Sequence, residues 1–202
     1  WLDVFILLPI ILLGLHRLLT GKGQIIYYVA LTCLFVQNYY FGYMTAIFLI
    51  IWTLVQLSRL KGQKLKRFVN FTLVSILSAL SSLFMLLPTY LDLKTHGETF
   101  TNIVNLKTED SWYLDFFAKN LVGSFDTTKF GSIPMISVGL VPLILALLFF
   151  TLKSIKPIVK LSYSLFFTLI ISSFYLQPLN LFWQGMHAPN MFLYRYAWVI
   201  SI

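Results

Sequence analysis

The sequence is poor in charged residues, and acidic residues are scarcest. Only 11% of its 202 residues are charged, with 7 Asp and Glu against 15 Lys and Arg. Soluble domains carry about a quarter charged residues, so this composition excludes an ordinary water-soluble globular domain. A single cysteine, Cys33, excludes a disulfide framework and a cysteine-based metal site. No phosphate-binding glycine loop, zinc-protease motif or serine nucleophile elbow occurs, so we expect no metal and no cofactor.

The chain is instead rich in apolar residues: 58% of its residues are hydrophobic, and they occur in long runs. Because a spanning helix needs about 20 mostly apolar residues, we predict an all-α, polytopic transmembrane helical bundle with about six to seven membrane segments. The chain starts and stops inside apolar sequence, and we expect an internal fragment forming a single membrane domain. The predicted membrane runs are 1–15, 25–37, 44–57, 68–88, 133–152, 157–176 and 191–202.

The basic residues gather in three short polar segments, 16–24, 58–67 and 153–160, which hold 10 of the 15 Lys and Arg and no acid. Short loops rich in Lys and Arg face the cytoplasm, so we interpret the basic excess as membrane topology and not as nucleic-acid binding. This places the chain in the cell membrane as a multi-pass protein. An outer loop, 89–132, and an outer re-entry loop, 177–190, are then extracytoplasmic.

Basic segments flank both ends of residues 25–57, so this stretch must cross the membrane an even number of times. The polar and aromatic residues 38–43 lie at its middle, where the tip of a helical hairpin belongs. The alternative is one long helix with a polar middle, and we favour the hairpin.

The outer loop 89–132 is predicted to carry a helix. Thr108 is a suitable N-cap, and Glu109 and Asp110 suit the first turn, where acids interact favourably with the helix dipole. Aromatic residues on one face of the following segment favour a helix lying in the outer membrane interface. Helix capping explains this acidic pair better than a general base or metal site does.

Two clusters are candidate binding sites. Asn38, Tyr39 and Tyr40 suit stacking on a sugar ring and hydrogen bonding to its hydroxyls, although composition alone favours an aromatic belt at the membrane surface. His187, Asn190 and Arg195 fall within nine residues, and no acid lies within 60 residues of Arg195. Because the guanidinium is a planar fork of donors, this cluster suits phosphate oxygens. The alternative is an arginine that extends to lipid headgroups.

Two segments resemble signatures of the YfhO family of bacterial multi-pass membrane proteins. They are 35–44, Phe-Val-Gln-Asn-Tyr-Tyr-Phe-Gly-Tyr-Met, and 185–196, Gly-Met-His-Ala-Pro-Asn-Met-Phe-Leu-Tyr-Arg-Tyr. The resemblance implies a GT-C-type membrane glycosyltransferase that takes a sugar from a polyprenyl-phosphate donor. The acceptor would be an envelope polymer such as lipoteichoic acid, on the extracytoplasmic side of the bilayer.

In the GT-C class the catalytic acid lies in the first large outer loop, which we expect to lie upstream of Trp1. We therefore leave the catalytic residue of this chain unassigned. Two other classes stay open: a transporter or flippase of lipid-linked envelope intermediates, and a non-catalytic membrane assembly subunit.

Overall fold

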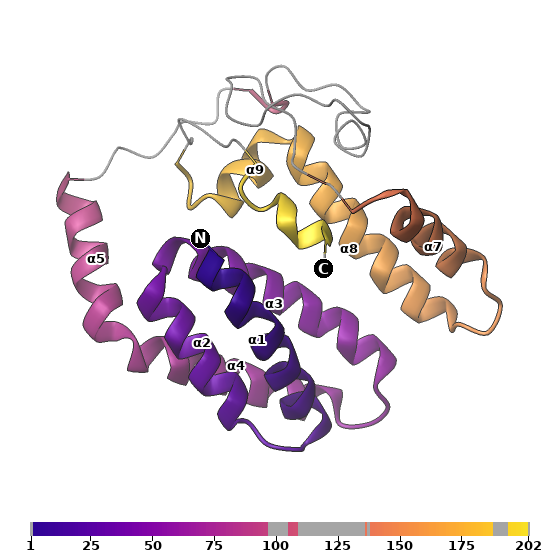
Figure 1. The fold of residues 1–202 in the computed structure, drawn as a ribbon, viewed down its shortest axis with the longest axis horizontal. Helices are drawn as coiled ribbons and strands as arrows, with labels where there is room; N and C mark the ends of the chain where they lie inside the picture. Colours follow the sequence, from indigo (N-terminus) through magenta and orange to yellow (C-terminus); the bar gives the residue numbers. More distant parts are fainter. Residues whose placement is uncertain (1, 97–104, 109–135, 137, 188–193, 202) are drawn as a thin grey trace. The chain divides into compact units, whose positions relative to one another are not determined.

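A computed structural model describes residues 2–96, 105–108, 136, 138–187 and 194–201 (Figure 1). These residues form helices, and their β-structure is limited to one isolated antiparallel bridge between Lys107 and Leu176. The predicted all-α fold is therefore confirmed. The chain divides into two compact units, Trp1–Glu98 and Thr99–Ile202, and each is described by itself below.

The N-terminal unit is built from α1 (Leu2–Thr20), α2 (Ile25–Gln37), α3 (Tyr39–Arg59), α4 (Lys64–Ser81) and α5 (Leu83–His96). Helices α1 to α4 run up and down as a bundle, and α2 packs against α1, α3 and α4 (Figure 1). Long apolar side chains fill the centre of this bundle. Those with almost no exposed surface include Ile11, Leu15, Tyr27, Leu31, Leu34, Met44 and Phe48.

Helix α2 is held on two sides by short contacts. A Cβ atom added at Gly14 of α1 would lie 2.6 Å from the backbone nitrogen of Tyr27, so only glycine permits this approach of α1 to α2. On the other side, the Tyr27 hydroxyl lies 2.8 Å from Ser75 Oγ and the Tyr28 hydroxyl 2.7 Å from Ser81 Oγ. Hydroxyl pairs of this kind join helices in membranes, where water does not compete for them.

The chain breaks between α2 and α3 at Asn38. This residue is extended, and its Oδ1 accepts a hydrogen bond from the Phe41 N–H over 3.0 Å, which caps the first turn of α3. Gly42 lets the two helices meet, because a Cβ there would lie 2.8 Å from Phe35 Cδ1. Residues 25–57 therefore form two packed helices and not one long one. Their membrane crossings stay a prediction.

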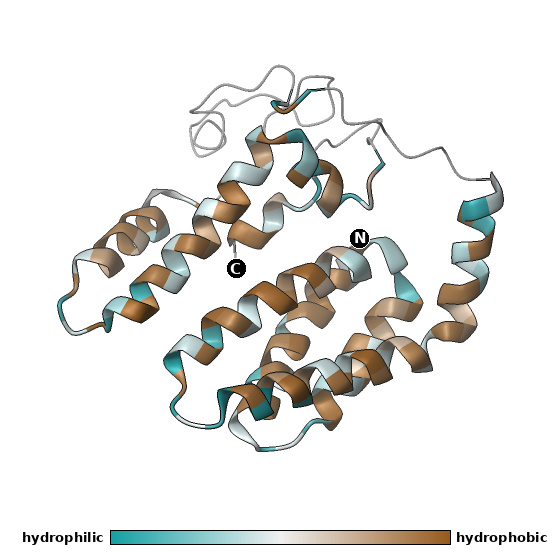
Figure 2. Cartoon of the chain, turned by 180° about the vertical axis from the view of Figure 1, so that it is seen from behind, coloured by the Kyte–Doolittle hydropathy of each residue, from teal (hydrophilic) through white to brown (hydrophobic). Residues whose placement is uncertain are grey.

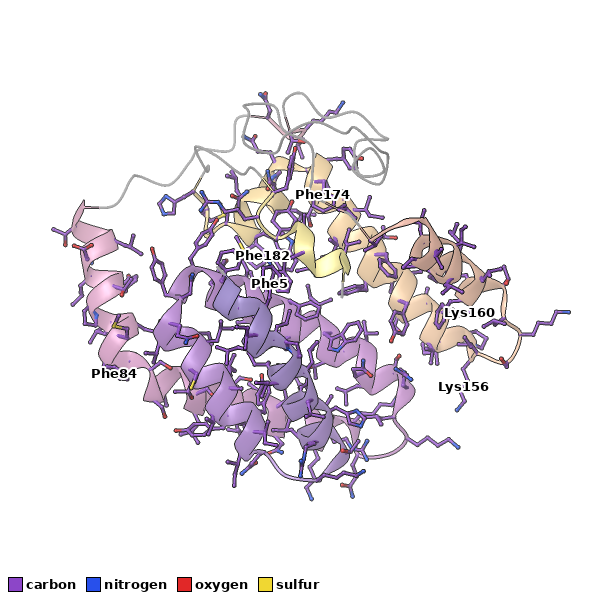
Figure 3. The ribbon with its side chains drawn as sticks, in the orientation of Figure 1. Phe5, Phe84, Lys156, Lys160, Phe174 and Phe182 are labelled. Atoms are coloured by element: carbon purple, nitrogen blue, oxygen red, sulfur yellow. The ribbon has the colours of Figure 1, made fainter. Side chains whose placement is uncertain are left out.

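The predicted run 68–88 does not form one straight helix. It divides between α4 and α5, which are bent by 73° at Ser82. Ser78 Oγ donates to Val74 O over 3.0 Å and Ser82 Oγ to Ser78 O over 2.7 Å, and such bonds to the preceding turn bend helices. Helix α5 then extends to His96, into the predicted outer loop, and exposes Phe84 on its surface (Figure 3).

The C-terminal unit contains α7 (Leu140–Thr151), α8 (Pro157–Tyr175), α9 (Gln177–Trp183) and the short 3-10 helix η1 (Ala197–Ser201). Lys160 of α8 donates from Nζ to the Phe150 carbonyl over 2.7 Å and so closes the basic α7–α8 turn, where Lys156 also lies (Figure 3). Helix α9 occupies the first half of the predicted re-entry loop. The predicted interfacial helix after Thr108 lies outside the described residues.

The apolar surface fits a membrane. Helices α3 and α8 are each long and apolar enough to cross one, and the bent α4–α5 pair passes the same test together, while α1, α2 and α7 are shorter apolar helices. Hydrophobic residues dominate the helices, and hydrophilic ones gather at the turns (Figure 2). The predicted helical membrane bundle is confirmed at this level.

Candidate functional site

The site in the C-terminal unit is organised around the last turn of α8. Terminal helix carbonyls have no partner within the helix, and here two other segments supply the donors. The Tyr196 hydroxyl donates to the Ser173 carbonyl over 2.7 Å. Thr108 donates from Oγ1 to the Phe174 carbonyl over 2.9 Å and from its N–H to the Tyr175 carbonyl over 3.0 Å. Three consecutive carbonyls thus hold two distant segments on one helix end.

The first of these segments is 105–108, part of the predicted outer loop. Besides the Thr108 contacts, the Leu106 carbonyl accepts from the Gln177 N–H over 3.0 Å, and the Asn105 N–H donates to Gln177 Oε1 over 3.1 Å. The segment therefore lies along the junction of α8 and α9. Segment 105–108 is fixed to the helices at this point.

The second segment carries Tyr196 in the middle of an aromatic stack. The Tyr196 ring lies 5.3 Å from Phe174 at an interplanar angle of 11°, and 5.2 Å from Trp183 at 12°. Trp183 Nε1 also donates to Ser173 Oγ over 3.1 Å. All three rings are buried. Parallel ring pairs of this kind contribute about 0.5–1.5 kcal/mol beyond the burial of their surface, so the stack fixes the backbone at Tyr196.

Arg195 is positioned by its two neighbours in sequence. Tyr196 stacks on Phe174, and Tyr194 packs against the same ring edge-on, with centroids 5.6 Å apart at 88°. Both neighbours are thus attached to the last turn of α8, and Arg195 itself is half-buried. A half-buried guanidinium on a fixed backbone is suited to binding an anion, because little reorganisation is needed when the anion arrives.

The other predicted site residues fall in three places. His187, half-buried, lies in the same unit as Arg195, four residues after α9 ends at Trp183. Asn190 lies outside the described residues. The first cluster belongs to the N-terminal unit: Asn38 caps α3, Tyr39 is 43% exposed on its first turn, and Tyr40 is half-buried.

The comparison with known protein families covers both clusters. A family model described as bacterial membrane protein YfhO matches residues 1–202, the full length of the chain. The chain belongs to the YfhO family. No curated protein and no solved structure matches it. Family membership thus establishes a bacterial membrane protein, in agreement with the apolar helices of this YfhO chain.

The sequence of this YfhO chain predicts that Arg195 is the cation of the site. It does not predict the contacts that hold Arg195 in place. Arg195 stands out in the sequence because no acid lies near it. These contacts are hydrogen bonds between residues far apart in the chain: Thr108 and Phe174 are 66 residues apart, and Ser173 and Tyr196 are 23 apart. The aromatic residues on both sides of Arg195 were the available signal. Where side chains are described, no group of three or more His, Cys, Asp or Glu is arranged to hold a metal ion.

Proposed function

We propose that this YfhO chain is part of a membrane glycosyltransferase. It transfers a sugar from a polyprenyl-phosphate carrier to an envelope polymer such as lipoteichoic acid on the extracytoplasmic side. The observation that carries the proposal is the attachment of Arg195, through Tyr194 and Tyr196, to the end of α8. A fixed cation at a membrane re-entry segment suits a phosphate-bearing lipid.

In this mechanism Arg195 binds the phosphate that leaves the sugar. As the bond between the anomeric carbon and the phosphate oxygen breaks, negative charge grows on the phosphate, and a preorganised guanidinium stabilises that charge. His187 and Asn190 help to hold the same phosphate. No residue of this chain is assigned as the base that activates the acceptor.

The first cluster supplies contacts to the sugar or the acceptor. The exposed ring of Tyr39 suits stacking on a sugar face, and Tyr40 extends the aromatic surface. Asn38 would act through its amide nitrogen, because its carbonyl oxygen already caps α3.

The test is transfer by the intact protein. Membranes from cells with and without the full-length gene receive a radiolabelled undecaprenyl-phosphate sugar, and label is counted in envelope polymer. Arg195→Ala should lower transfer about 100-fold or more, the usual cost of removing a group that stabilises developing charge. Arg195→Lys should recover only part of the transfer activity, because an ammonium is a point charge without the planar fork of donors.

Lys94→Ala, which removes a cation from α5, is the control. Normal transfer by Arg195→Ala would refute the phosphate role.

A transporter or flippase of lipid-linked intermediates is the second candidate. The bent α4–α5 pair favours it, because broken helices form the binding sites of many transporters. Sealed vesicles distinguish the two: redistribution of the donor across the bilayer without label in polymer supports the flippase. If the gene changes neither readout over a panel of donor sugars, an assembly role takes their place.

A further inference from the structure

The N-terminal unit brings two basic loops to one end of its bundle. Helices α1 and α3 end there, and α2 and α4 begin there, so residues 16–24 and 58–67 lie at the same end although they are about 40 positions apart in the chain (Figure 1). We call this surface the basic end. Its Lys and Arg side chains are all exposed except the last, which is half-buried: Arg17, Lys22, Arg59, Lys61, Lys64, Lys66 and Arg67.

Few acids oppose this charge. The sequence has no Asp or Glu between Asp3 and Asp92. Asp3 lies in the first turn of α1, about 20 Å along the helix from Arg17. Asp92 lies in α5, beyond the bend at Ser82. The basic end is therefore a surface of one sign, formed by two loops that the fold places together.

Apolar side chains lie directly beside these cations. Ile25 and Leu65, at the starts of α2 and α4, are 74% and 77% exposed. The phosphate backbone of a nucleic acid would suit these cations but presents little apolar surface to Ile25 and Leu65. A lipid offers both partners, a phosphate for the cations and acyl chains for the apolar groups, at the depth where headgroups and hydrocarbon meet.

We propose that the basic end binds the headgroups of anionic phospholipids, with Lys61, Lys64 and Lys66 on their phosphates. This interaction goes beyond the proposed glycosyltransferase activity and does not depend on it. Each Lys or Arg held near an anionic lipid surface strengthens binding roughly five-fold, so a few residues suffice for a clear preference over neutral lipid.

The test is lipid retention by the whole chain purified in a neutral detergent. Phosphatidylglycerol and phosphatidylcholine with identical acyl chains are added at equal concentration, and bound lipids are counted by native mass spectrometry. The wild-type chain should retain phosphatidylglycerol preferentially, and less of it as salt increases. Lys64→Gln with Lys66→Gln should weaken that retention roughly 25-fold and leave phosphatidylcholine unchanged. Glutamine matches lysine in helix propensity, so α4 should persist.

The matched control is Lys94→Gln with Lys107→Gln, which removes the same charge from exposed positions outside the basic end. It should retain phosphatidylglycerol like the wild type. Equal retention of the two lipids by the wild type, or equal losses in the two double variants, would overturn the proposal. Full displacement of the lipid by an equal concentration of glycerol phosphate would also overturn it, since the ligand would then be a soluble anion and not a lipid.

Discussion

At the scale of single residues, Tyr196 does more than fill space. Its ring stacks between Phe174 and Trp183, and its hydroxyl donates a hydrogen bond to the Ser173 carbonyl at the end of α8. The two roles are separable by mutation, because phenylalanine keeps the ring and loses the hydroxyl. A displacement of Tyr196 would also displace Arg195, since the two are neighbours in the chain.

Tyr196→Phe should lower the stability of the C-terminal unit by about 1–3 kcal/mol, the usual cost of leaving one buried partner of a hydrogen bond unsatisfied. Tyr196→Ala should cost more, because it removes the stack as well. Thermal unfolding in detergent measures both effects. Equal melting temperatures for the wild type and Tyr196→Ala would contradict the anchoring described here. The exposed Tyr90→Phe is the control.

At the scale of helices, the close approach of α1 to α2 depends on Gly14. Alanine normally favours a helix over glycine by about 1 kcal/mol. Gly14→Ala should nevertheless destabilise the N-terminal unit, because the new methyl group would meet the backbone of Tyr27 at 2.6 Å. The thermal midpoint should fall, whereas Ile10→Ala at an exposed site of the same helix should change it little. A midpoint raised by Gly14→Ala would show that α1 and α2 are further apart.

Some of these helices could be predicted from the sequence, and some of their ends could not. The break at Asn38 was predictable because polar residues interrupt an apolar run there. The bend at Ser82 was not, because serine hydroxyls bond to the preceding turn without interrupting the apolar pattern. The same limit applies to the site: the charge of Arg195 is visible in the sequence, but the contacts of Thr108 and Ser173 arise only from folding.

At the scale of the whole molecule, the three basic segments predict one orientation in the membrane. In a Cys33→Ser background, single cysteines at Lys22, Lys61 and Lys156 should react with a membrane-impermeant maleimide only when the cytoplasmic side is open. A cysteine at Thr95, in the predicted outer loop, should react in intact cells. All four positions are exposed. Labelling of Lys22→Cys or Lys61→Cys in intact cells would reverse the predicted topology.

The shared helix end at α8 also makes the order of its last carbonyls important. An α-helix turns about 100° per residue, so deleting one residue from 173–175 would move the remaining acceptors around the helix axis relative to one another. Thr108 and Tyr196 would then no longer both reach their present acceptors. The spacing of these carbonyls along α8 therefore sets the position of segment 105–108 relative to Arg195.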